Sequence, residues 1–412
     1  MAISIHQPEQ PGLPEPEGNA VSLRAGSDGR AAYQVSGVPI HMAVFTDRSP
    51  VVHPYLDLLF GARKWGRLQV EEWPGVRPLW LLRRAKKDDI LHLGWPSYHY
   101  GGASRWRFLK GLARYSLFLL LVRLRRTKIV WMAHNLYPHD MKYRRLEWLG
   151  RVVTLAFANA VIAHDQRMLD AVKHEFCLRR PGYVVPHMSY VGVYRDTIRK
   201  EEARLRLGIP SGAFVFLVFG LIRPYKGIDA VIAAFRRSRR PSDRLIVAGW
   251  PFDGEYARKI QQLIAADPQI ICDFRKIPEE DLATLMKASD VVVSAGRGQY
   301  TSGATMIALS FGRPVIASRN CAPASVRDGF AATLYDPADA EALPRAMAEA
   351  PARFNEDRSV EIAHCMTEVS PDKVARRFVE VLRKICAGQG VRKPWDAHRR
   401  KRRTDRTSAS AL

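Results

Sequence analysis

Two basic residues stand between glycines where an apolar run gives way to a helical pattern. Arg223 and Lys226 lie between Gly220 and Gly227. The apolar run at residues 214–219 is typical of a buried strand, and apolar residues recur at helical spacing after Gly227. Both cations are therefore expected in a strand-to-helix loop, where the following helix offers free N–H groups to an anion. This pattern predicts a phosphate site.

A second stretch of small and hydroxylated residues predicts another helix start near a strand end. Gln299, Thr301, Ser302 and Gly303 follow the apolar run at residues 291–294. Thr301 or Ser302 is expected to cap the next helix, and Gly303 would let a phosphate approach the backbone. A helix cap without any ligand would need the same residue types, and the two interpretations are compatible.

Histidines are concentrated in the first half of the chain. Nine of the twelve lie within residues 41–187, so this half holds groups that exchange protons near neutral pH. The apolar run at residues 128–133 leads into His134, and His139 and Asp140 follow in the same loop. Either side chain could take a proton from a bound hydroxyl group, and we expect Asp140, or else His139, to be this base. The alternative is that Asp140 caps a helix and His139 is solvated.

Other strand ends carry further candidates. Asp47 and His53 lie in the loop of residues 46–54, after the first predicted strand, and are second choices for this base. His92 and His187 lie at other predicted strand ends, where each would line a binding site or form a hydrogen bond in the core.

Short apolar runs alternate with helical patterns in two series, which predicts an α/β protein with two parallel sheets. The first series of predicted strands comprises residues 41–45, 90–93, 128–133, 160–163 and 183–185, and the second comprises residues 214–219, 245–247, 270–274, 291–294, 314–317 and 332–335. We expect two Rossmann-like domains that face each other across a cleft, where small ligands usually bind.

The net charge of +23 indicates an anionic partner. Residues 105–128 hold eight cations and no acid around the apolar run 117–122, which is far too short to span a bilayer. Such a segment suits the surface of an anionic membrane, and it equally suits a domain helix with a solvated basic face. The basic cluster at residues 398–403 is a weaker indication of lipid. We expect no nucleic-acid partner, because no recognised module interleaves the basic residues with aromatic ones.

Residues 217–229 resemble the arginine-plus-lysine signature of GT-B glycosyltransferases, especially those similar to glycosyltransferase family 4, in which the pair holds the diphosphate of a nucleotide-sugar. The resemblance continues in order through residues 245–249, 277–282, 288–294 and 301–318. It implies that Arg223, Lys226, Gln299, Thr301, Ser302 and Gly303 bind the donor. His134 and the asparagine after it are similar to a His-Asn motif of this family, whose histidine often touches the donor sugar.

One departure from the family bears on stereochemistry. Retaining family-4 enzymes carry two glutamates at positions that correspond to Gln299 and Ile307 here. The loss of both acids resembles bacterial exopolysaccharide transferases, and inversion is favoured. No two aspartates are separated by a single residue, so the Asp-x-Asp metal site of the other common glycosyltransferase fold is missing. We expect no metal and no cofactor, with protein cations stabilising the leaving phosphate.

Few large apolar groups among residues 1–35 predict a disordered leader. Near the other end, Val374, Phe378, Val381 and Leu382 fall on one face of an amphipathic helix, which the resemblance implies crosses back onto the first domain. The loop with Asp47 and His53 matches the position of the acceptor-side loop in GT-B enzymes.

The expected division of the chain is a disordered leader (1–35), an acceptor-side domain (36–190), a linker (191–212), a nucleotide-sugar-binding domain (213–370), a crossover helix (371–388) and a basic disordered tail (389–412). The expected activity is transfer of a hexose from a donor of GDP-mannose or UDP-glucose type to a lipid-linked oligosaccharide. The expected location is the cytoplasm, at the inner face of the plasma membrane. A nucleotide-sugar epimerase of GT-B fold and a basic nucleic-acid-binding protein are the alternatives.

Overall fold

The computed structural model describes the chain apart from residues 1–38, 46–53, 66, 86, 178–179, 266, 297–301, 324, 327–328, 330 and 389–412, and apart from the side chains of residues 62 and 65. The expected leader and tail, with the basic cluster at residues 398–403, lie outside the described residues.

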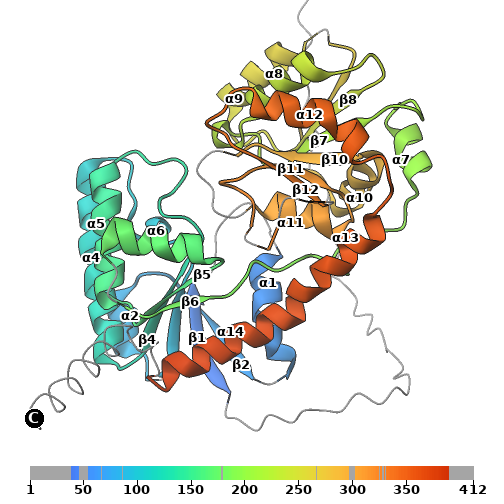
Figure 1. The fold of residues 1–412 in the computed structure, drawn as a ribbon. Coiled ribbons are helices and arrows are strands. Elements are labelled where there is room, and N and C mark those ends of the chain that lie inside the picture. The colour runs from blue at the N-terminus through green and yellow to red at the C-terminus, as the bar shows by residue number, and fades with distance from the viewer. Residues whose placement is uncertain are drawn as a thin grey trace, which may run out of the picture. The chain divides into compact units, whose positions relative to one another are not determined.

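Six parallel strands form the first sheet, in the order β2-β1-β3-β4-β5-β6 (Figure 1). Their bounds are β1 Ile40–Phe45, β2 Leu68–Trp73, β3 Ile90–Leu93, β4 Lys128–Ala133, β5 Ala160–Ala163 and β6 Gly182–Val184. The sequence predicted all of them to within one residue except β2. Strand β2 lies at the sheet edge and exposes Gln69 and Glu72, so it lacks the continuous apolar run of an inner parallel strand.

Helices cover both faces of the first sheet. The helices of this half are α1 Tyr55–Leu59, η1 Phe60–Trp65, α2 Pro78–Arg83, α3 Ser97–Tyr100, α4 Arg105–Leu124, α5 Arg144–Phe157 and α6 Gln166–Phe176. Helices α2 to α6 share one hydrophobic core with the sheet. On its other face, α1 and η1 share a second core with the last described helix, α14 Pro371–Cys386.

The second sheet also has six parallel strands, in the order β12-β11-β10-β7-β8-β9. Its strands are β7 Val215–Phe219, β8 Arg244–Ala248, β9 Ile270–Asp273, β10 Val291–Ser294, β11 Val315–Ser318 and β12 Ala332–Tyr335. Its helices are α7 Lys200–Arg206, η2 Pro224–Lys226, α8 Ile228–Ser238, α9 Gly254–Ile264, α10 Glu279–Ala288, α11 Gly303–Ser310, α12 Ala342–Arg353, α13 Ser359–Met366 and η3 Thr367–Val369. Both faces carry a hydrophobic core. The two parallel α/β sheets confirm the predicted fold class.

Two segments connect the halves. The stretch expected as a linker, residues 191–212, contains α7, whose Ala203 is buried in a core of the second sheet. Helix α14 returns to the first sheet, with the predicted apolar residues Val374, Phe378, Val381 and Leu382 all buried there. The chain therefore begins and ends the described part of its fold in the same core.

Candidate active site

The turn after β7 presents the two predicted cations. Strand β7 is followed by the single 3₁₀ turn η2 and then by α8. Pro224 opens the turn, because its fixed φ suits a first helical residue. Gly227 ends it with a φ of 66°, a left-handed conformation that other residues rarely adopt. Arg223 and Lys226 thus lie on a short, conformationally restricted turn at the carboxyl end of β7.

Gly227 also brings this turn against the loop after β10. A Cβ at Gly227 would lie 2.7 Å from the carbonyl oxygen of Ala295, which is too close for any other residue type. Ala295 follows Ser294, the last residue of β10, whose hydroxyl lies 3.2 Å from that of Ser302. Ser302 caps α11 and accepts a hydrogen bond of 3.3 Å from the backbone N–H of Thr305. The η2 turn and the amino end of α11 therefore adjoin each other.

The predicted donor residues are only partly described. Ser302 is the N-cap, as expected, and Gly303 is the first residue of α11. Gln299 and Thr301 lie outside the described residues. The donor-binding role of the group stays a prediction.

The loop after β4 contacts the η2 turn directly. The ring of His139 stacks on Tyr225, with centroids 3.9 Å apart and planes 9° from parallel. Next to it, an Asp140 carboxylate oxygen accepts a hydrogen bond of 2.6 Å from the Arg223 guanidinium. His139 and Asp140 thus contact Tyr225 and Arg223, and the two loops that meet here follow the carboxyl ends of β4 and β7.

Arg223 is held from two sides. Its guanidinium lies 3.9 Å from the centre of the Phe252 ring, in a cation–π contact from the loop after β8. Its side chain is only 15% exposed, whereas that of Asp140 is 73% exposed. The predicted base is therefore the ion-pair partner of the predicted phosphate-binding cation. An anion of higher charge can displace Asp140 without unpacking the arginine, because the carboxylate faces solvent.

The environment of His139 keeps its ring neutral. Loss of solvent around the ring, followed by the nearby charges of Lys226 and Arg223, lowers the pKa of His139 to about 4, against a smaller opposing effect of Asp140. A neutral imidazole beside two cations can accept a hydrogen bond near pH 7, but it is a weak base.

Aromatic and imidazole rings gather at the carboxyl edge of the first sheet. His134 directly follows β4, and His164 directly follows β5. The rings of His134 and Trp95 stack with centroids 4.4 Å apart, and Tyr55 meets both histidines edge-on. His187, after β6, lies 5.1 Å from His164 between ring centroids.

Hydrogen bonds fix the tautomers of this cluster. His164 Nδ1 lies 3.1 Å from the carbonyl oxygen of Val185, which can only accept, so this nitrogen carries a proton. Burial lowers the pKa of His164 to about 4, so its ring is neutral and Nε2 is an acceptor. His134 Nδ1, 3.0 Å from that Nε2, must then donate to it. In a neutral His134 the acceptor nitrogen is therefore Nε2.

Residues from both halves line a small hollow beside this cluster. It has a volume of about 290 Å³ and is lined by His164, Asp165, His187 and Pro323 among others. Next to it, Arg167 pairs with Asp165 and donates to backbone carbonyls after β11. The carboxyl edge of the first sheet is thus joined to the second half at a second place.

Other predicted residues are placed elsewhere or not described. His92 is a core residue: its ring packs between Phe60 and Phe378, and burial lowers its pKa to about 4. Asp47 and His53 lie outside the described residues. Among the residues that the structure describes, no three His, Cys, Asp or Glu side chains are grouped so as to hold a metal ion.

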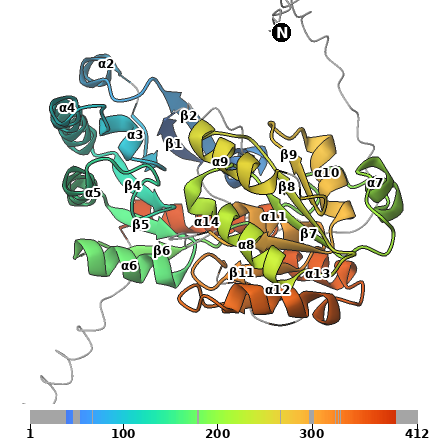
Figure 2. The ribbon, with the colours of Figure 1, turned by 90° about the horizontal axis from the view of Figure 1, so that it is seen from above.

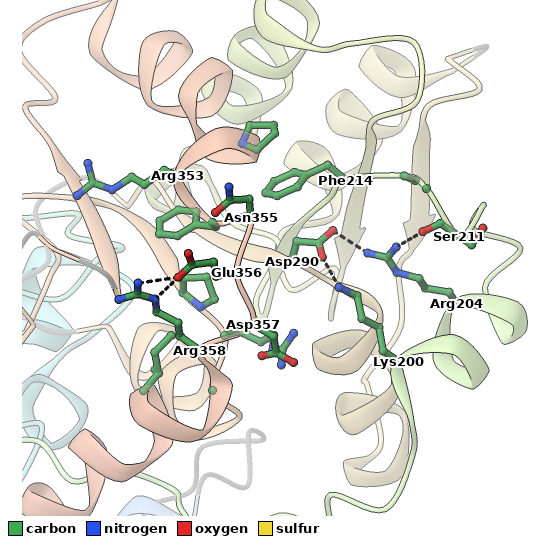
Figure 3. Close-up of a pocket in the computed structure, with 18 of the residues that line it drawn as sticks. Lys200, Arg204, Ser211, Phe214, Asp290, Arg353, Asn355, Glu356, Asp357 and Arg358 are labelled. Carbon is green, nitrogen blue, oxygen red and sulfur yellow. Dashed lines mark hydrogen bonds and ion pairs between the residues drawn. The ribbon is translucent and has the colours of Figure 1, made fainter.

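A larger hollow, of about 650 Å³, lies at the opposite edge of the second sheet (Figure 3). It is lined by residues that precede strands, among them Phe214 and Pro314. Asp290 in its wall accepts hydrogen bonds of 2.7 Å from both Lys200 and Arg204. Ligands of open α/β sheets bind at the carboxyl ends of strands. We therefore assign these ion pairs to the attachment of α7 to the sheet.

Several residues of the site were not predicted. His164, Tyr55, Trp95, Tyr225 and Phe252 all contact a predicted residue or its partner. His164 had a usable signal, because it follows a predicted strand as His134 does. The others depend on contacts between loops that the sequence does not reveal.

A comparison with known families identifies the second half. Residues 213–351 match the family described as "Glycosyl transferases group 1". The chain carries a group 1 glycosyltransferase domain. The match includes the η2 turn and α11, which are the two parts of the predicted phosphate site. The glycosyltransferase domain thus contains the candidate donor site.

Curated relatives are glycosyltransferases too. The chain is 28% identical over 245 residues to a GDP-mannose:glycolipid 4-beta-D-mannosyltransferase of Xanthomonas campestris pv. campestris, a match that covers 58% of this chain and 64% of the relative. It is 30% identical over 233 residues to D-inositol 3-phosphate glycosyltransferase 1 of Catenulispora acidiphila, a match that covers 52% of this chain and 55% of the relative. The chain spans less than two thirds of the length of these relatives.

Solved structures agree on the fold. HepE of Anabaena, solved with UDP and glucose, aligns with a TM-score of 0.64 at 16% identity and covers 84% of this chain and 100% of that one. The sucrose-phosphate synthase of Thermosynechococcus elongatus aligns with a TM-score of 0.62, also at 16% identity, covering 84% and 99%. These likenesses confirm the GT-B fold that the sequence predicted. The predicted resemblance to group 1 glycosyltransferases is confirmed by the family match at residues 213–351.

Proposed function

We propose that this glycosyltransferase moves a hexose from a nucleotide-sugar, of GDP-mannose or UDP-glucose type, to a lipid-linked oligosaccharide during synthesis of exopolysaccharide or another surface polysaccharide. The observation that carries the proposal is the contact between the η2 turn and the loop after β4, which brings Arg223 and Asp140 together. The Xanthomonas relative, whose name gives GDP-mannose as donor and a glycolipid as acceptor, supports this substrate class.

On the donor side, Arg223 and Lys226 bind the diphosphate together with the amino end of α11. Breaking the bond between the sugar and the phosphate oxygen leaves negative charge on that oxygen, and fixed cations lower the barrier. The contact of Arg223 with Phe252 holds the guanidinium in place before the donor arrives.

On the acceptor side, Asp140 serves as the base. The incoming diphosphate takes the place of the Asp140 carboxylate on Arg223, which frees the carboxylate beside the donor. The acceptor hydroxyl gives its proton to Asp140, its oxygen bonds to the anomeric carbon, and the nucleoside diphosphate leaves from the opposite face. The anomeric configuration inverts. The neutral His139 is the alternative acceptor of this proton.

His134 contacts the donor sugar in this proposal. The resemblance supports this contact, because the histidine of the corresponding motif often touches the donor sugar. No metal or other cofactor takes part in the proposed transfer. The enzyme works at the cytoplasmic face of the plasma membrane, where an anionic polyprenyl diphosphate would present the acceptor.

Incubation of the full chain with labelled GDP-mannose, UDP-glucose and related donors, and with membranes that contain lipid-linked glycans, tests the proposal. We expect one donor to label the glycolipid with inverted configuration. Arg223→Ala and Lys226→Ala should abolish this labelling. Arg237→Ala should not, because Arg237 lies on α8 and forms an exposed ion pair with Glu341, the N-cap of α12. Normal labelling by both of the first two variants would refute the donor site. Conversion of the donor without any acceptor would indicate an epimerase.

A further inference from the structure

Helix α4 carries two apolar stripes on opposite sides. One stripe, with Phe108, Tyr115 and Phe118, is buried in the core of the first sheet. The other consists of Trp106, Leu109, Leu117, Leu120 and Leu124, which are 42–75% exposed. At 3.6 residues per turn, residues nine positions apart lie opposite each other, as Leu109 and Phe118 do. The exposed leucines are therefore not the margin of the core but a separate face.

Cations flank the exposed stripe. By helical geometry, Lys110 and Arg114 lie along one side of it, and Arg105 and Arg123 lie along the other. All four side chains are exposed. The only acid in helices α2 to α5 is Glu147, which is buried and bonded to Ser97 and Tyr100. The face is thus apolar along its centre and basic along both sides.

Helix α2, which packs against α4, also exposes leucines. Both views place α4 between α2 and α5 at the outer side of the first sheet (Figures 1 and 2). Leu79 and Leu82, one turn apart on α2, are 71% and 62% exposed. None of the described helices is long and apolar enough to cross a membrane.

We infer that the exposed stripe of α4, with Leu79 and Leu82, lies in the interface of an anionic phospholipid membrane. Leucine and tryptophan enter the headgroup region while the flanking cations meet lipid phosphates. A nucleic acid would leave the leucines in water. A second copy placed about a two-fold axis would bring the flanking arginines against each other. The inference deepens the proposed function by naming the surface that meets the membrane, and its test needs neither donor nor acceptor.

The test is sedimentation of the full chain with lipid vesicles that lack glycolipid. We expect binding to phosphatidylcholine vesicles that contain phosphatidylglycerol, weaker binding without it, and weakening by salt. Leu117→Ser, Leu120→Ser and Leu124→Ser should each weaken binding about tenfold. Lys110→Gln and Arg114→Gln should each weaken it about fivefold.

The control is Leu205→Ser, because Leu205 on α7 is 81% exposed and lies on the second half. Its binding should equal that of the wild type. The inference would be overturned if the wild-type protein did not sediment with the anionic vesicles, or if the α4 variants bound them as strongly as the wild type does. A dimer in sedimentation equilibrium that Leu120→Ser dissociates, without vesicle binding, would assign the face to a second copy instead. Sugar transfer to a detergent-dispersed acceptor reports the proposed function separately, so that either idea can fail alone.

Discussion

Replacing Asp140 with asparagine should separate donor binding from turnover. The carboxylate lies 2.6 Å from Arg223 and is 73% exposed, so we expect this ion pair to contribute about 0.2–1 kcal/mol. Asparagine leaves Arg223 free for the diphosphate, and donor affinity should rise by up to about fivefold. The amide cannot accept the acceptor proton, so kcat should fall by about 10²–10⁴. The two effects have opposite signs, which a general loss of structure would not produce.

Calorimetric titration with UDP and GDP, together with initial rates of transfer, measures both effects. Arg223→Gln is the complementary variant: it loses hydrogen bonds between charged groups, worth about 1.5–3 kcal/mol, so nucleotide affinity should fall by about 10-fold to 150-fold. Arg237→Gln on α8 is the matched control, with neither change expected. If the Asp140→Asn variant bound nucleotide more weakly than the wild type and kept a normal kcat, two ideas would be refuted. These are the competition between Asp140 and the diphosphate for Arg223, and the role of Asp140 as the base.

Three further predictions concern stability. Burial keeps His92 neutral by lowering its pKa to about 4, from 6.5 in the unfolded chain. Acidification from pH 7 to pH 5 should therefore lower the free energy of unfolding by about 2 kcal/mol through this residue, and urea titrations of His92→Phe should lack this loss. Gly227→Ala should lower the free energy of unfolding by about 1–2 kcal/mol because of the left-handed φ, and by more because of the close contact with Ala295. It should also weaken nucleotide binding. Gly254→Ala is the control: its Cβ would meet no atom within 4 Å, so neither thermal unfolding nor nucleotide binding should change. Asp290→Asn removes the carboxylate partner of Arg204, whose side chain is only 7% exposed. The free energy of unfolding in urea titrations should therefore fall by about 3 kcal/mol or more, while the rate of sugar transfer stays unchanged.

The sequence predicted those elements whose physical cause is local. Strands β3, β4, β5, β10 and β12 have the predicted bounds, because each is a short apolar run between polar residues. Helix α14 was predicted from the spacing of Val374 and Phe378. Strand β2 was missed because its edge position tolerates Gln69 and Glu72. Helix α7 was read as linker, since most of its seven residues are charged and its burial depends on the fit to α10.

The site divides in the same way. The turn with Arg223 and the cap at Ser302 follow from residue types at a strand end, and both are found there. The pairing of Arg223 with Asp140 joins residues 83 positions apart and depends on how two loops from different sheets meet, which no local pattern encodes. The donation from His134 to His164 likewise needs two adjacent strands to be in register.

The place of α14 has a consequence for biosynthesis. Its buried residues, such as Phe378 and Leu382, complete the core that β1 and α1 begin more than three hundred residues earlier. A nascent polypeptide on the ribosome would have one face of its first sheet only partly covered, by α1 and η1, until residues 371–386 emerge. Among the described residues, neither core of the second sheet contains a residue of α14, so this sheet can finish folding first. Translation order and folding order are therefore reversed for the two halves, and the partly covered face is where a chaperone would bind meanwhile.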